Sequence, residues 1–259
     1  MRMMKKVLGT VTVLALSVSL LAGCGSTAAS PVSSAASTAA ESATSSVVSE
    51  TTSAAADENA AAAAQLLNDL TGSYQELWPV ILADEYQQTW LDDCTALVGE
   101  DNAEAAFEKL FSMVTGDVYG EDAVKAYANG GGAYFCGFTN SLATLTFNGE
   151  TSTISGTDKD GNVLFSHTYH YIGMEPVRGL YEFESDDADS GEFTYFFLAP
   201  DTSAETYHIE FRYGSDAEAL SQYDAGEYAY WLASGISTDC DQTMIDNCIE
   251  LFCTENLAG

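Results

Sequence analysis

The sequence predicts an α+β, mainly β domain in which helices flank an antiparallel β-barrel at its N- and C-terminal ends. Apolar residues recur at helical spacing before residue 130 and again near the C-terminus. Between them, from Tyr134 onwards, short segments alternate apolar and polar residues. Turn sequences such as Asn148-Gly149 and Asp160-Gly161 join these segments, as expected for consecutive antiparallel strands. A meander of this kind can close into a barrel.

The first 23 residues resemble a bacterial lipoprotein signal peptide. Three basic residues within the first six precede an apolar run, Val7–Leu21, and the run ends in Leu21-Ala22-Gly23-Cys24. Signal peptides of this class are cut before the cysteine, so Cys24 is the predicted lipidation site. The alternative is a transmembrane helix, but the run is short for a membrane span.

Residues 24–63 are predicted to be a flexible tether, and residues 64–259 the folded domain. The tether consists almost entirely of Ser, Ala and Thr and has no aromatic residue. Such a segment cannot bury a core. Together, lipid and tether predict a domain held at the extracytoplasmic face of the cell membrane.

The charge balance restricts the partners that the domain can have. Three of the eight basic residues lie in the predicted signal peptide, which leaves five against 39 acidic residues. Nucleic acid and anionic membrane surfaces repel such a chain, whereas a cation is attracted to it. An acidic surface also simply keeps an exported protein soluble, so the charge alone does not establish a metal site.

Besides Cys24, the chain has five cysteines, an odd number that leaves at least one thiol without a partner in the same chain. No CxxC occurs, which argues against a cysteine zinc knuckle. Export suits disulfides, whereas an anaerobic source would keep the thiols reduced. We expect at most one or two bridges among Cys94, Cys136, Cys240, Cys248 and Cys253.

The helical pattern has five segments before a glycine break and one near the C-terminus. Pro79 interrupts the second segment, and Gly130–Gly132 ends the series. The expected helices span Ala61–Asp69, Ser73–Thr89, Leu91–Val98, Ala103–Met113, Glu121–Asn129 and Asp241–Asn256.

Six strands are expected in the second half. They are joined by short turns and by the acidic loop Asp186–Gly191. The following segment, residues 217–236, has a mixed pattern that favours no single element. The expected strands span Thr144–Asn148, Thr151–Thr157, Asn162–Ile172, Gly179–Glu184, Glu192–Leu198 and Glu205–Tyr213.

The last of these strands carries the most informative polar pair. Within Tyr207–Tyr213 the apolar residues point one way, while His208, Glu210 and Arg212 point the other. An imidazole and a carboxylate two residues apart on one strand face can bind the same metal ion. The alternative is a polar face without a ligand, in which Glu210 pairs with Arg212.

Two motifs in this chain resemble the ZinT family of exported zinc-binding proteins. The first is the stretch from Leu67 to Pro79, with Gly72-x-Tyr74-Gln75 followed by Trp78-Pro79. The second reads His208-Ile-Glu210-Phe-Arg-Tyr-Gly214-Ser-Asp216 and is followed by an aromatic-rich segment. The resemblance covers about residues 65–256, with both motifs in the family's order and at similar spacing.

The resemblance implies a calycin- or lipocalin-like barrel with flanking helices. It also implies a zinc ion held by barrel histidines, and a role in capturing Zn2+ for an ABC-type importer or its binding protein. It implies no enzyme activity.

The chain departs from the family pattern at the metal ligands. His208 falls on the first histidine of the family's His-x-His, and Glu210 replaces the second. Phe196, three residues before Ala199-Pro200, replaces a third histidine. In a meander, His170, Phe196 and His208 are expected toward one end of the barrel, so His170 is the expected substitute ligand. The alternative is that His170 is simply a hydrogen-bonded histidine.

His170, His208 and Glu210 with one water would give zinc an ordinary four-coordinate shell. The leading hypothesis is therefore a lipid-anchored, extracytoplasmic zinc-binding protein that captures or buffers Zn2+ for import. The alternative is a metal-free calycin-like lipoprotein that binds a small apolar ligand or a surface protein.

Overall fold

A computed structural model describes residues 58–200 and 208–258 of the chain. The predicted signal peptide, the predicted lipidation site Cys24 and most of the predicted tether lie outside the described residues. Within the described part, no helix is both long and apolar enough to cross a membrane.

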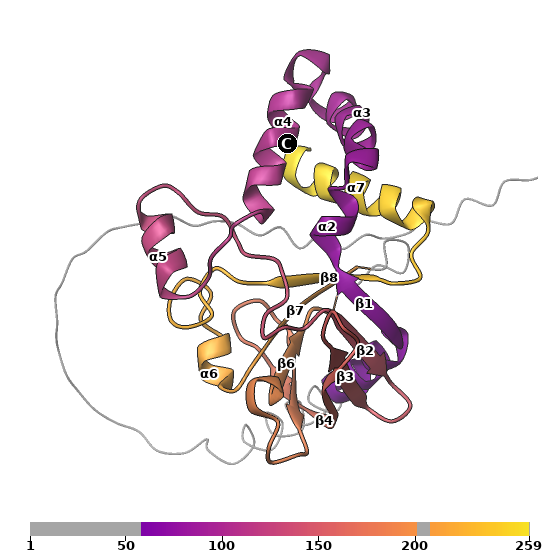
Figure 1. The fold of residues 1–259 in the computed structure, drawn as a ribbon, viewed down its shortest axis with the longest axis vertical. Helices are drawn as coiled ribbons and strands as arrows, with labels where there is room; N and C mark the ends of the chain where they lie inside the picture. Colours follow the sequence, from indigo (N-terminus) through magenta and orange to yellow (C-terminus); the bar gives the residue numbers. More distant parts are fainter. Residues whose placement is uncertain (1–57, 201–207, 259) are drawn as a thin grey trace, which may run out of the picture. The chain divides into compact units, whose positions relative to one another are not determined.

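The domain is built on a closed antiparallel barrel of eight strands, which confirms the predicted fold class (Figure 1). The strands pair in chain order, and β8 closes the barrel by pairing with β1. The strands are β1 (Gly72–Glu76), β2 (Thr144–Asn148), β3 (Thr153–Thr157), β4 (Val163–Met174), β5 (Tyr181–Ser185), β6 (Tyr195–Leu198), β7 (His208–Gly214) and β8 (Ala233–Ser237).

The barrel interior is packed with aromatic side chains. Alternate residues of each strand point inward, and five of the largest inward residues are less than 2% exposed: Phe147, Phe183, Phe196, Phe211 and Tyr213. Full burial of one such side chain contributes about 1.5–3 kcal/mol. In β2, β5 and β7, the apolar residues that alternate in the sequence are thus the ones that fill the barrel.

Helices form a second core outside the barrel. The helix α3 packs against α4 and α7, and α2 packs against β8 and α7 (Figure 1). The indole of Trp90 is buried there and donates a hydrogen bond of 2.7 Å to the carbonyl of Ile81. The helices are residues 58–69, α2 (Leu77–Ile81), α3 (Gln87–Val98), α4 (Glu100–Val114), α5 (Glu121–Ala128), α6 (Ala217–Leu220) and α7 (Gln242–Leu257), with 3-10 turns at Asp84–Tyr86 and Gly191–Phe193.

Two elements differ from the expectation. The predicted helix Ser73–Thr89 is wrong at its start, because residues 72–76 form β1 and pair with both β2 and β8. The strand β8 begins within the segment that favoured no single element and ends one residue after it. All five of its residues are buried, so the sequence lacks the alternation that indicates a strand. These two strands close the barrel, so pairing between distant segments decides their structure.

The segment between β7 and β8 is tied to the barrel by Arg212. This side chain is fully buried, and its guanidinium donates hydrogen bonds to the carbonyls of Leu220 and Tyr228. It also lies over the ring of Tyr223, 4.3 Å from the ring centroid. The guanidinium of Arg212 thus binds the segment between β7 and β8 through these hydrogen bonds and this ring contact.

Candidate functional site

The outer face of β7 presents His208 and Glu210 to a small cavity. Ile209 and Phe211 belong to the barrel core, so His208 and Glu210, which alternate with them, point away from the interior. Both side chains are half-buried and line the same cavity, which has a volume of about 70 Å³. The predicted pairing of His208 and Glu210 on one strand face thus places them in one site.

The other walls of this cavity come from α2 and α7. The helix α2 follows β1 without a loop, since Glu76 ends the strand and Leu77 begins the helix. Its contribution is Leu77, Trp78 and Ile81. The helix α7 starts after β8, where the carboxylate of Asp241 accepts a hydrogen bond of 3.0 Å from the backbone amide of Met244.

The residues that α7 contributes form one helical stripe that sequence reasoning missed. Cys248, Leu251, Phe252 and Glu255 line the cavity, and their spacing of three, four and seven residues places them on one face of the helix. That spacing is visible in the sequence. Nothing in the sequence indicates that the stripe faces β7.

The environment of the cavity keeps the thiol of Cys248 neutral. The candidate metal ligands are therefore the oxygen and nitrogen donors. Burial, together with the nearby Cys240, Glu255 and Glu210, raises the pKa of Cys248 to about 12. A thiol coordinates a metal as the thiolate, so Cys248 is a poor ligand at neutral pH. The remaining donors that line the cavity are His208, Glu210 and Glu255.

These donors suit zinc by chemical type, because imidazole and carboxylate are ordinary zinc ligands. They are not gathered around one point. Within residues 58–200 and 208–258, no group of three or more His, Cys, Asp or Glu side chains is arranged to hold a metal ion. An ion bound here would therefore require rotation of at least one side chain.

The structure does not bring His170 together with His208 and Glu210. His170 pairs with Glu184 on β5, which pairs with Tyr195 on β6, which in turn pairs with Gly214 on β7. His170 is therefore level with the end of β7 opposite to His208, about 20 Å away along the strand at roughly 3.3 Å per residue. The expectation that both histidines lie toward one end of the barrel is wrong.

His170 has its own carboxylate partners on the exposed surface. Its Nδ1 lies 2.7 Å from an oxygen of Asp186, and its Nε2 lies 4.0 Å from an oxygen of Glu184. His167 makes a similar pair, with 2.8 Å between its Nδ1 and an oxygen of Asp187. The two histidines thus hold the loop after β5, in agreement with the alternative interpretation of His170.

Phe196 lies in the barrel core, away from His208. It pairs with Phe183 and Tyr213 across the sheet, and its side chain is fully buried. Its ring centroid lies 5.3 Å from that of Tyr213 and 5.4 Å from that of Tyr169. The side chain of Phe196 therefore contributes to core packing, and it points to the opposite side of the sheet from the His208 cavity.

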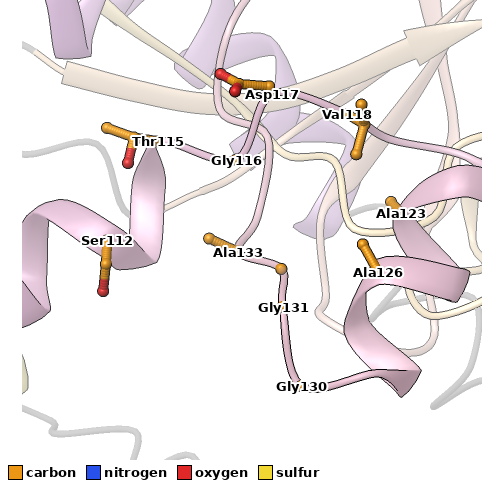
Figure 2. Close-up of a pocket in the computed structure, with 11 residues that line it drawn as sticks. Ser112, Thr115, Gly116, Asp117, Val118, Ala123, Ala126, Gly130, Gly131 and Ala133 are labelled. Atoms are coloured by element: carbon orange, nitrogen blue, oxygen red, sulfur yellow. The ribbon is translucent and has the colours of Figure 1, made fainter.

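A second and larger cavity lies between α4, α5 and the glycine-rich segment. Its volume is about 590 Å³, and small residues line most of it. Figure 2 shows Ser112 and Thr115 on one side, Ala123 and Ala126 of α5 on the other, and Gly130, Gly131 and Ala133 between them. Large exposed apolar side chains lie on α4 and α5, at Phe111, Met113 and Tyr127, and in the loop between these helices, at Val118.

The solved structures similar to this chain include two from Streptococcus pneumoniae. No protein-family model and no curated protein matches the chain. The Zn(II)-bound ZinT-like domain of AdcA from Streptococcus pneumoniae is 16% identical with a TM-score of 0.45, over 71% of this chain and 89% of that domain. Zn(II)-bound AdcA from the same organism is 14% identical with a TM-score of 0.41, over 74% of this chain and 35% of AdcA, so the chain spans about a third of that protein.

Neither likeness identifies the family of this chain. The barrel is established by its own strand pairing. The resemblance to ZinT stays a prediction from the two motifs.

Proposed function

We propose that this protein binds a divalent cation, zinc before others, in the cavity between β7, α2 and α7. One observation carries the proposal: His208 and Glu210 point from the same strand face into one small cavity. The strongly acidic chain attracts cations to the surface around it. The proposed role is binding rather than catalysis.

Glu255 is the proposed third ligand in place of His170. It lines the cavity from α7, opposite the strand that carries His208 and Glu210. Because the three donors are not gathered in the described part of the chain, closure around the ion would involve rotation of the exposed Glu255 side chain. Ordering that side chain reduces affinity relative to a preformed site.

The proposed setting is the extracytoplasmic face of the cell membrane, with the lipid on Cys24 as the anchor. In that setting the protein would capture or buffer Zn2+ and pass it to an ABC-type importer or its binding protein. This part of the proposal rests on the sequence of the first 24 residues and on the ZinT-like motifs.

A zinc titration of the purified chain by calorimetry tests the site. We expect micromolar or tighter binding by the parent, loss of that binding in His208→Ala, and weaker binding in Glu210→Gln and Glu255→Gln. His170→Ala is the matched control, since it removes the exposed histidine on β4 and should bind zinc as the parent does. Affinity should fall below about pH 6, because imidazole coordinates only when neutral. Equal, weak binding by the parent and His208→Ala would assign the zinc to the acidic surface and refute the site.

The second candidate function is binding of a small apolar ligand, and the cavity beside α5 is the observation that favours it. Its volume of about 590 Å³ lies within the ordinary range for ligand pockets. The barrel interior, by contrast, is filled by aromatic side chains. Saturable binding of the neutral dye Nile red, lost in the cavity-filling variant Ala126→Trp and kept in His208→Ala, would support this function. Binding unaffected by Ala126→Trp would exclude this cavity.

A further inference from the structure

Packing of α3 against α7 brings two thiols from distant parts of the chain into contact. Cys94 lies on α3 and Cys253 on α7, and their Sγ atoms are 4.0 Å apart. Both side chains are fully buried in the helical core. The two residues are 159 positions apart in the sequence, so the contact depends on the tertiary fold.

We propose that Cys94 and Cys253 form a disulfide when the chain meets a disulfide oxidant. A disulfide bond is about 2.05 Å long, so the two sulfur atoms must approach by about 2 Å. Side-chain rotation and a small shift between the helices supply such a movement. In the reaction, the oxidant's S–S bond breaks as the new one forms. Both protons and two electrons of the thiols pass to the oxidant, which leaves as two thiols.

Burial determines when this bond forms. An oxidant must reach a sulfur atom to exchange with it, and the side chains of Cys94 and Cys253 are fully buried in the folded chain. The bond therefore forms while the chain folds, before α3 and α7 close over the sulfur atoms, or during local opening of these helices. Once formed, it is shielded from reductants by the same packing.

The bond fixes the helix that forms one wall of the His208 cavity. Cys253 adjoins Phe252 and lies two residues before Glu255, both of which line that cavity. Cross-linking α7 to α3 holds this part of the helix in place. This consequence, unlike the disulfide itself, rests on the proposed function.

Peptide mapping tests the disulfide directly. The purified full chain is oxidised with glutathione disulfide, its remaining thiols are blocked with iodoacetamide, and it is digested with a protease that cleaves at Glu. We expect a peptide pair that joins Cys94 to Cys253, and two fewer alkylated cysteines than in the reduced sample. The oxidised chain should melt roughly 5–15 °C above the reduced chain, because the bond closes a long loop.

Two serine variants serve as matched controls. Cys253→Ser should lose both the cross-linked peptide and the increase in Tm on oxidation, whereas Cys136→Ser should keep both. Comparing oxidised and reduced samples of the same variant separates the effect of the bond on Tm from the effect of the substitution itself. Absence of the Cys94–Cys253 peptide, a bridge that joins Cys240 to Cys248 instead, or an unchanged Tm would overturn the proposal. None of these measurements involves metal, so their failure leaves the zinc proposal intact.

Discussion

Replacing Arg212 with methionine tests how a buried cation holds the segment between β7 and β8. The side chain is fully buried and donates to the carbonyls of Leu220 and Tyr228. It lies over the Tyr223 ring, and its Nε has no hydrogen-bond partner among the described residues. Methionine is unbranched and apolar, so it occupies much of the same space without the charge.

Two opposing effects determine how much Arg212→Met changes the free energy of unfolding. Each hydrogen bond from a charged donor contributes about 1.5–3 kcal/mol, so loss of the bonds to Leu220 and Tyr228 alone costs about 3–6 kcal/mol. Loss of the cation–π contact with Tyr223 costs up to about 2 kcal/mol more. Removing the charge from the interior offsets part of this loss of stability, because burial penalises the charged form and lowers the pKa of Arg212. We expect a net destabilisation of about 2–4 kcal/mol.

Urea unfolding followed by tryptophan fluorescence measures this change, and thermal melting should show a decrease in Tm of roughly 5–15 °C. Lys125→Met is the matched control. Lys125 is exposed and pairs with the exposed Asp122 three residues earlier on α5, so its replacement should leave stability unchanged. If Arg212→Met were as stable as the parent, relief of desolvation would fully offset the lost hydrogen bonds, and the reasoning about Arg212 would be refuted.

Two further predictions concern Phe196 in the barrel core and the half-buried Asp93 on α3. Phe196→His should lose about 2–4 kcal/mol of stability, because residue 196 faces the packed interior. Zinc should not restore this stability, because His208 faces outward. Zinc-dependent recovery in urea unfolding would contradict this prediction. Asp93→Asn should raise Tm at pH 7. Burial and the neighbouring Glu250, Asp246 and Asp92 raise the folded-state pKa of Asp93, so the ionised carboxylate destabilises the fold above that pKa. The gain should vanish near pH 3, where the carboxyl is protonated in both states; an equal gain at both pH values would be inconsistent with this cause.

The sequence by itself determined the strands that have one buried face. In β2, β5 and β7, side chains alternate between the barrel interior and the outside, and the same alternation of apolar and polar residues is readable along the chain. It also determined that His208 and Glu210 share the outer face of β7, since residues two apart on a strand point the same way.

Only the tertiary structure decided which distant residues meet. β1 and β8 lack a clear local pattern and are strands because each pairs with the other and with a neighbour. His170 is far from His208 because register along three strand pairs places it level with Gly214. The stripe of α7 that carries Glu255 faces the His208 cavity because α7 packs on α2 and α3. Spacing along one element is local and readable from the sequence, whereas contacts between elements depend on register and packing.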